Sequence, residues 1–130
     1  MTDLGTHVLL DLEGCPEDLL RDDARIRSGL RKAALEAGAT IVGEAFHTFN
    51  PPGVSGVILI AESHLSVHVW PEYDYVAIDF FSCGEEVIPQ AAIDVLEARL
   101  KPARQDIRRI DRGQAVDQAG RRVHTAPFER

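Results

Sequence analysis

Residues 55–84 decide the fold of this chain: Ser55-Gly-Val-Ile-Leu-Ile-Ala-Glu-Ser-His-Leu-Ser-Val-His-Val-Trp-Pro-Glu-Tyr-Asp-Tyr-Val-Ala-Ile-Asp-Phe-Phe-Ser-Cys-Gly84. The β-branched and aromatic residues, with a turn-like segment at 71–74, predict three consecutive strands at residues 55–62, 64–70 and 75–82. The first strand is almost wholly apolar, so we expect both of its faces to be covered. The middle of the chain therefore predicts the centre of a β-sheet.

The flanking sequence predicts two helices. Apolar residues repeat at helical spacing over residues 23–37, and Gly38 follows as a helix stop. A second helix is expected over residues 85–100, with Pro89 in its first turns. The remaining segments predict strands at residues 7–12, 39–49 and 104–110, a turn at 15–17 that leads towards the first helix, and a loop at 50–53.

This order of elements, in which a run of strands separates two helices, predicts an α+β fold. We expect a two-layer α/β sandwich, with the two helices on one face of a mainly antiparallel sheet. The other face of the apolar central strands also needs a cover, and a second copy of the chain would supply it, so a dimer is expected. Residues 1–113 would form the single domain, and residues 114–130 a polar tail.

Composition excludes several classes of protein. A length of 130 residues and a hydrophobic content of 45% indicate one globular domain. The net charge of −7 argues against binding to nucleic acid; it would suit a cationic small molecule, although solubility alone also explains it. There is no apolar run long enough to span a membrane and no visible secretory signal, so we expect a cytoplasmic protein whose two cysteines are thiols.

Polar residues with reactive side chains cluster around the most apolar strands. Hydroxyl, imidazole, carboxylate and thiol groups occur together there, which is what covalent chemistry requires; the set is Glu62, Ser63, His64, Ser66, His68, Glu72 and Cys83. Along a regular strand, Ser63 and His68 point to opposite faces and lie about 16 Å apart. They can meet only if the chain kinks at Glu62-Ser63, or if they approach each other across strands or across subunits.

Each of these residues also has a structural explanation. Ser63 could form hydrogen bonds at a strand end, His68 could be a structural histidine, and Cys83 could be a small buried residue. A zinc site at His64 and His68 is not expected, because a strand separates them by about 13 Å. The aromatic residues Phe49, Trp70 and Tyr75 could all belong to the core. A prediction of function therefore depends on all of these residues together and not on any one of them.

The ordered set Glu62-Ser63-His64, His68, Trp70-Pro71-Glu72-Tyr73 and Cys83-Gly84 resembles the bacterial and archaeal S-adenosylmethionine decarboxylases. Residues 49–56 and the Gly-Cys pair at 14–15 resemble the same family, and the similarity runs from about residue 4 to residue 113. The resemblance implies a carboxy-lyase of polyamine and spermidine biosynthesis, which converts adenosylmethionine to its decarboxylated form and CO2. Its proenzyme would cleave itself into a β chain of residues 1–62 and an α chain of residues 63–130.

The resemblance also implies a role for individual residues in processing and catalysis. Ser63 would become a covalent pyruvoyl group that forms a Schiff base with the substrate, without metal or pyridoxal phosphate. His68 would remove the α-proton of Ser63 during processing, and Ser55 would help to stabilise the tetrahedral intermediate. Cys83 would protonate the substrate carbon after CO2 leaves.

In the family, active sites lie at a homodimer interface and use both protomers, and the sequence leaves open whether dimers pair into larger assemblies. The substrate-binding residues implied by the resemblance are Phe49, which would stack on adenine, Glu72, which would bind the ribose, and Trp70.

Two positions differ from the family pattern. Glu13 stands where a large aromatic residue is usual, and Asp74 stands where glycine is usual. Additional acids would suit a basic amino acid, and some relatives of this fold decarboxylate ornithine or arginine. Adenosylmethionine is the first hypothesis because Phe49, Trp70 and Glu72 are retained, and ornithine or arginine is the alternative. A non-catalytic regulatory relative is a third hypothesis, against which the intact Ser55, Ser63, His68 and Cys83 argue.

Overall fold

The computed structural model describes residues 4–49, 53–83 and 86–113. The strands in this part are β1 (Gly5–Glu13), β2 (Ile41–Thr48), β3 (Val54–Ile60), β4 (Ser63–Trp70), β5 (Tyr75–Ser82) and β6 (Arg104–Arg112). The helices are α1 (Glu17–Leu20), α2 (Asp23–Glu36), α3 (Pro89–Leu100) and the 3-10 helix η1 (Pro71–Tyr73).

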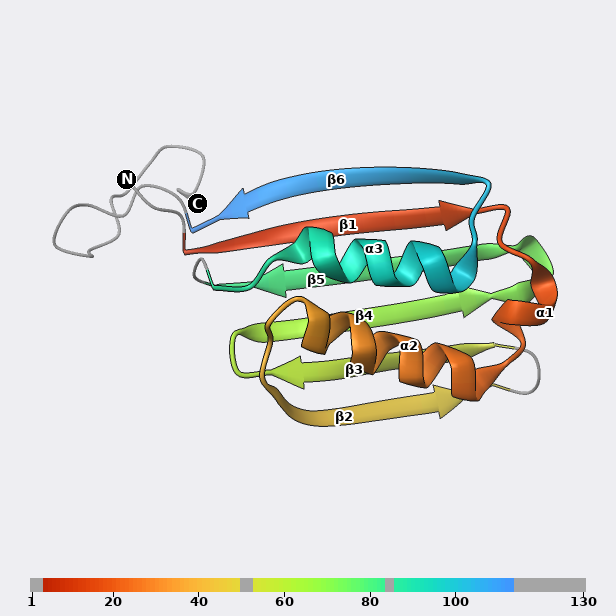
Figure 1. Ribbon diagram of the computed structural model, residues 1–130, viewed down its shortest axis with the longest axis horizontal. Coiled ribbons are helices and arrows are strands. Elements are labelled where there is room, and N and C mark those ends of the chain that lie inside the picture. The colour runs from red at the N-terminus through yellow and green to blue at the C-terminus, as the bar shows by residue number, and fades with distance from the viewer. Residues whose placement is uncertain (1–3, 50–52, 84–85, 114–130) are drawn as a thin grey trace, which may run out of the picture.

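The six strands form one sheet in the order β2-β3-β4-β5-β1-β6, and every neighbouring pair is antiparallel (Figure 1). The strands β2 to β5 are neighbours in the sheet in the order of the sequence, whereas β1, the first strand, lies between β5 and β6. Together with the helices, this sheet confirms the predicted two-layer α+β fold.

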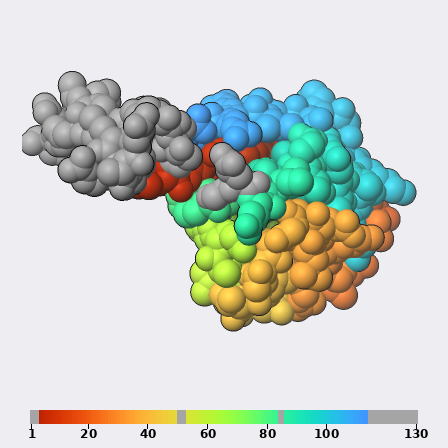
Figure 2. Space-filling model, turned by 60° about the vertical axis from the view of Figure 1, so that its left-hand side comes forward, coloured from red at the N-terminus to blue at the C-terminus, as the bar shows by residue number. Residues whose placement is uncertain are grey.

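Helices α2 and α3 cover one face of the sheet and lie side by side over it (Figure 2). The core between the two layers contains Leu10 and Leu12 of β1, Leu30 and Ala33 of α2, and Leu96 of α3, all almost fully buried. Each buried leucine contributes about 1.5–3 kcal/mol relative to an exposed position. The small side chain of Ala33 lets α2 approach the sheet closely.

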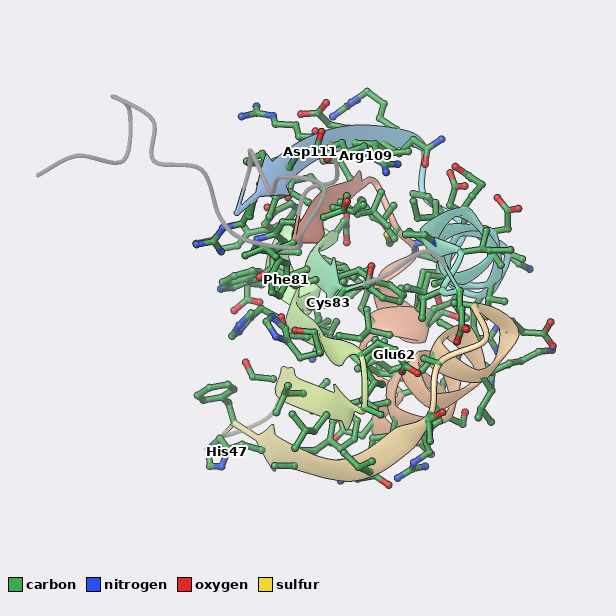
Figure 3. The ribbon with its side chains drawn as sticks, turned by 90° about the vertical axis from the view of Figure 1, so that its left-hand side faces the viewer. His47, Glu62, Phe81, Cys83, Arg109 and Asp111 are labelled. Carbon is green, nitrogen blue, oxygen red and sulfur yellow. The ribbon has the colours of Figure 1, made fainter. Side chains whose placement is uncertain are left out.

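The opposite face of the sheet, called the open face below, is not covered by any element of the described part of the chain (Figure 3). Apolar side chains remain accessible there, including Leu59 at 53% and Trp70 at 38% exposure. The second cover that the sequence predicts for the strand at 55–62 is therefore not supplied by the described part of one protomer. A face of this kind is typical of a surface that another protein covers.

The boundaries of the helices mostly follow from local chemistry. The side chain of Asp22 accepts a hydrogen bond from the backbone N–H of Arg25 (3.1 Å), which caps the start of α2. Gly38, with φ +85°, follows its end. Helix α3 begins at Pro89 and not at residue 85 as predicted, because proline, which lacks an N–H, fits the first helical position.

Three further differences from the sequence prediction concern short segments. Helix α1 was not predicted and begins at Glu17, the last residue of the predicted turn at 15–17, and the 3-10 helix η1 lies in the predicted turn at 71–74. Strand β6 continues to Arg112, beyond the predicted end at residue 110.

The tail predicted at 114–130 lies outside the described residues. Among the described residues, no helix is long and apolar enough to cross a membrane.

Candidate active site

A hydrogen bond joins Ser55 on β3 to His68 on β4. The two residues face each other directly in the β3–β4 register, and Ser55 Oγ lies 2.8 Å from His68 Nδ1. Both side chains lie on the open face. In the tautomer that carries its hydrogen on Nδ1, His68 donates to Ser55 and keeps Nε2 available as a base. The pair can therefore orient an imidazole for proton transfer.

Aromatic side chains hold this pair on one side. The ring of Trp70 lies 6.1 Å from the ring of His68 and stacks on Tyr75, with 5.3 Å between the centroids. The hydroxyl of Tyr75 donates to Asp11 Oδ1 at 2.7 Å. Burial, with a smaller contribution from this bond, raises the pKa of Tyr75 to about 12. Sequence reasoning missed Tyr75 and Asp11 as supports of the site, because only the strand register places them beside Trp70.

A pocket of about 360 Å³ opens beside the Ser55–His68 pair. Its lining includes three residues that the sequence predicted to bind substrate, Phe49, Trp70 and Glu72. Two aromatic side chains can hold a planar ring, and a carboxylate can accept hydrogen bonds from neighbouring hydroxyl groups. The structure thus brings together five of the predicted site residues at one end of β4.

The predicted cleavage site lies at the other end of β4, in the turn between β3 and β4. Ile60 pairs with Ser63, so the loop consists of Ala61 and Glu62 alone. Two-residue hairpins normally use turns with positive φ, but neither loop residue has a positive φ. Ser63, the next residue, instead adopts φ +154°, a conformation that side chains disfavour by about 1–3 kcal/mol.

Neighbouring backbone groups hold this strained turn in place. The backbone N–H of Cys83 donates to the carbonyl oxygen of Glu62 (2.9 Å), and the N–H of Ala61 donates to Thr40 (2.8 Å). The side chain of Glu62 also accepts from the Thr40 N–H at 3.1 Å. The carbonyl that Ser63 would attack is therefore already polarised by a hydrogen-bond donor.

The two cysteines occupy different environments. Cys15 is buried, and burial, together with the nearby charge of Asp74, raises the pKa of its thiol to about 11. Cys83 is exposed and lies next to the Glu62–Ser63 turn (Figure 3). Of the two thiols, only Cys83 is placed to take part in chemistry at residue 63.

The structure does not bring Ser63 and His68 together within one protomer. Strand β4 pairs with β5 without interruption from Ser63, opposite Ser82, to Trp70, opposite Tyr75. No kink at Glu62-Ser63 shortens the strand, and about 16 Å separates the two residues. Neither a kink nor strand pairing within one protomer therefore brings the two residues together.

The two unusual acids have local explanations. Asp74 has φ +53° and ends η1, a left-handed position that glycine fills readily and aspartate tolerates. Glu13 is exposed and forms an ion pair with Arg104, with 3.5 Å between nitrogen and oxygen. Neither acid lines the pocket beside His68. Within the described residues, no group of three or more potential ligands could hold a metal ion.

The fold and these two clusters define a small α+β enzyme whose reactive side chains lie on or beside one open sheet face. Residues 6–113 match the S-adenosylmethionine decarboxylase family, and the chain belongs to this family.

Several relatives extend over most of the chain. An S-adenosylmethionine decarboxylase proenzyme from Moorella thermoacetica is 47% identical over 113 residues, which is 87% of this chain and 90% of the relative. The proenzyme from Thermotoga maritima is 45% identical and covers 87% of both chains. The crystal structure of the adenosylmethionine decarboxylase from Aquifex aeolicus VF5 has 34% identity and a TM-score of 0.81, over 87% of this chain and 93% of its own.

Proposed function

We propose that this chain is a self-processing, pyruvoyl-dependent decarboxylase that converts S-adenosylmethionine to its decarboxylated form and CO2. Family membership supports this activity. The observation that carries the proposal is the turn at Glu62-Ser63, where a strained serine follows a carbonyl that the Cys83 N–H polarises. A turn of this kind fits the formation of a pyruvoyl group at residue 63.

Processing begins at the Glu62–Ser63 peptide bond. The hydroxyl of Ser63 attacks the carbonyl carbon of Glu62, and the negative charge that develops on oxygen is stabilised by the Cys83 N–H. Collapse of this intermediate breaks the C–N bond and leaves an ester between the two residues. Loss of the Ser63 α-proton then eliminates Glu62 as a free carboxylate, and hydrolysis of the resulting dehydroalanine releases ammonia and leaves pyruvoyl.

The predicted base for this elimination would come from another protomer. His68 is the predicted base, but it lies about 16 Å along the same strand from Ser63. If two open faces pack with a two-fold axis across the middle of β4, Ser63 of one copy meets the Ser55–His68 pair of the other. Such a homodimer would also cover Leu59 and Trp70, and it would enclose two equivalent sites.

In the decarboxylation itself, the pyruvoyl carbonyl would condense with the substrate amine and accept the electron pair that CO2 leaves behind. The pocket beside His68 would hold the nucleoside, with Phe49 on the adenine and Glu72 on the ribose hydroxyls. Cys83 would donate a proton to the substrate carbon, and water would restore the proton to its thiolate. Each site would therefore combine the turn of one protomer with the pocket of the other.

Adenosylmethionine is the substrate that the family indicates. The ornithine or arginine alternative rested on Glu13 and Asp74, and neither acid lines the nucleoside pocket. The relatives described above are all named for adenosylmethionine. A parallel assay of CO2 release from adenosylmethionine, ornithine and arginine tests this choice directly.

A complementation experiment tests the shared site. Ser63→Ala and His68→Ala chains, carrying different tags, are co-expressed and the mixed dimers are purified. In a mixed dimer, the His68→Ala chain still has its own Ser63, and the other chain supplies an intact His68. We expect intact-mass spectrometry to find the His68→Ala chain cleaved in mixed dimers, while homodimers of either variant stay uncleaved.

Two results would contradict the shared site. The first is a mixed dimer in which neither chain is cleaved, although unmodified dimers process normally. The second is an unmodified chain that sediments as a monomer at micromolar concentration and still cleaves itself. In either case the pyruvoyl chemistry would have to be completed within one protomer.

A further inference from the structure

A second pocket, of about 600 Å³, lies at the Cys83 end of the sheet. Its lining includes Cys83, Phe81 and, from strand β6, Ile110 and Arg112. Of these residues, only Cys83 has a role in the proposed function. The pocket adjoins the cleavage site, because the Cys83 N–H is bonded to the Glu62 carbonyl.

Gly5, which also lines this pocket, has no side chain and so leaves room for the ring of Phe81. Gly5 lies opposite Arg112 in the β1–β6 register. A Cβ atom at Gly5 would come within 2.7 Å of Phe81 Cζ, so the phenyl ring lies over the glycine. The guanidinium carbon of Arg112 is 5.5 Å from the centre of the same ring. Arg112 is therefore held over Phe81, on the side of the sheet where Cys83 lies.

Arg112 differs from the other arginines of its strand. Arg104, Arg108 and Arg109 each have a carboxylate within 4 Å, from Glu13, Asp106 and Asp111 respectively. The side chain of Arg112 forms no ion pair and no hydrogen bond with any residue that the structure describes. A guanidinium group is always charged and offers a planar pair of donors that matches a carboxylate.

We propose that Arg112 binds the α-carboxylate of the substrate; this inference rests on the function proposed above. Adenosylmethionine carries a single anionic group, its α-carboxylate, beside a cationic amine and a cationic sulfonium. Cys83 has to protonate the carbon from which that carboxylate departs, so the carboxylate must lie near Cys83 before the reaction. Arg112 is the cation that lines the same pocket as Cys83.

This position has a consequence for the catalytic cycle. The contact exists in the bound substrate and is lost once CO2 has formed, so it contributes to substrate binding more than to the chemical step. The product keeps two positive charges and has no carboxylate, so Arg112 repels it. Arg112 therefore selects the amino acid over the amine and favours release of the product.

Binding measurements can isolate this contact from catalysis. The Ser63→Ala protein, which cannot form the cofactor, is titrated calorimetrically with adenosylmethionine and with its carboxamide, which lacks the negative charge. In the Ser63→Ala background, Arg112→Gln should weaken binding of adenosylmethionine at least about tenfold, which is the effect of one charge-assisted hydrogen bond. The same substitution should weaken binding of the carboxamide less than about twofold. Arg112→Lys, which keeps the charge, should recover part of the difference.

Arg108→Gln is the matched control, because Arg108 lies on the same strand four residues away and is paired with Asp106. This variant should not change the preference for the acid over the carboxamide. In the processed enzyme, Arg112→Gln should raise KM at least about tenfold and change kcat less than about twofold, with self-cleavage complete by mass spectrometry.

Equal effects of Arg112→Gln on both ligands, or no effect on either, would overturn the inference even if the enzyme decarboxylates adenosylmethionine. By contrast, if the parent protein does not bind adenosylmethionine and the processed protein releases no CO2 from it, the proposed function fails and the inference with it.

Discussion

Ser63 and His68 lie at opposite ends of the same β-strand, and its unbroken pairing with β5 keeps them apart. A base five residues away on a regular strand is about 16 Å distant, far beyond the reach of a proton transfer. An active site that needs both residues must therefore be built from two copies of β4. This requirement links the open face of the sheet to the chemistry of the turn.

The first prediction concerns the covalent state of the protein. Purified protein should consist of two chains, residues 1–62 and 63–130, if Ser63 attacks the Glu62 carbonyl in its strained turn as proposed. Ser63→Ala should remain whole, since no hydroxyl is left to form the ester. Intact-mass spectrometry distinguishes the two. Ser66→Ala, a serine on the same strand, should be cleaved normally, and a single uncut chain after long incubation of the unmodified protein would refute the processing scheme.

The second prediction concerns His68 as a base. His68→Ala should accumulate the ester between Glu62 and Ser63, because the acyl shift does not need the imidazole but the elimination does. Hydroxylamine, which attacks esters, should then cleave the chain at this position. His47 lies opposite Ser55 in the sheet, so His47→Ala is the matched control and should process normally. Normal processing of His68→Ala would show that another group is the base.

A third prediction follows from the hydrogen bond between Tyr75 and Asp11. The pKa of Tyr75 is raised to about 12 in the folded protein, against an ordinary value of 10. Its stabilising contribution is therefore complete below about pH 10, where the tyrosine is neutral in both states, and is lost as the pH rises from about 10 to about 12.

Urea unfolding at about pH 9 and about pH 11 measures this effect. The unmodified protein should lose more stability over this interval than Tyr75→Phe, which has no phenolic proton. Tyr73 is 74% exposed, so Tyr73→Phe should behave like the unmodified protein. If the free energy of unfolding of Tyr75→Phe and of the unmodified protein had the same pH dependence, the bond between Tyr75 and Asp11 would not stabilise the fold in this way.

The elements of the fold were predictable because their signals are local. The β-branched and aromatic residues of the strands and the spacing of apolar residues along helix α2 identify the two layers, and Gly38 marks the end of that helix. The start of α3 was less predictable, since a proline is compatible with several positions in the first turn. The position of β1 between β5 and β6 could not be predicted, because it depends on pairing between strands that are far apart in the sequence.

The candidate site residues could be named from the sequence, but their arrangement could not. The residue types around Glu62-Ser63 and His68 favour the proposed chemistry, whereas the Ser55–His68 contact depends on the register of β3 against β4. Likewise, the polarised carbonyl of Glu62 involves a backbone N–H, which every residue except proline possesses, so no residue type could have signalled it. Gly5 was also overlooked. Its lack of a side chain matters only because the ring of Phe81 lies over it, and this contact cannot be read from the sequence.

The fourth prediction concerns Cys83 as the proton donor. Cys83→Ala should still process, because the backbone N–H that polarises Glu62 is kept, but it should turn over slowly. Without the thiol, the substrate amine can remain attached to the α chain after misplaced protonation. Mass spectrometry should therefore show an amino group in place of the ketone oxygen after incubation with substrate. Full turnover of Cys83→Ala without this modification would show that Cys83 is not the proton donor.

The last prediction decides between the two kinds of substrate. Asp74 adopts a left-handed backbone conformation and Glu13 is paired with Arg104, so neither acid needs a substrate cation to explain it. Asp74→Gly and Glu13→Gln should each change kcat/KM for adenosylmethionine by less than about threefold, under about 1 kcal/mol. If ornithine or arginine were the substrate, removing a buried partner of its distal cation would cost about 2–5 kcal/mol, at least about a thirtyfold loss. CO2 release from a basic amino acid and not from adenosylmethionine, with such a loss in either variant, would reverse the substrate assignment and leave the processing of Ser63 standing.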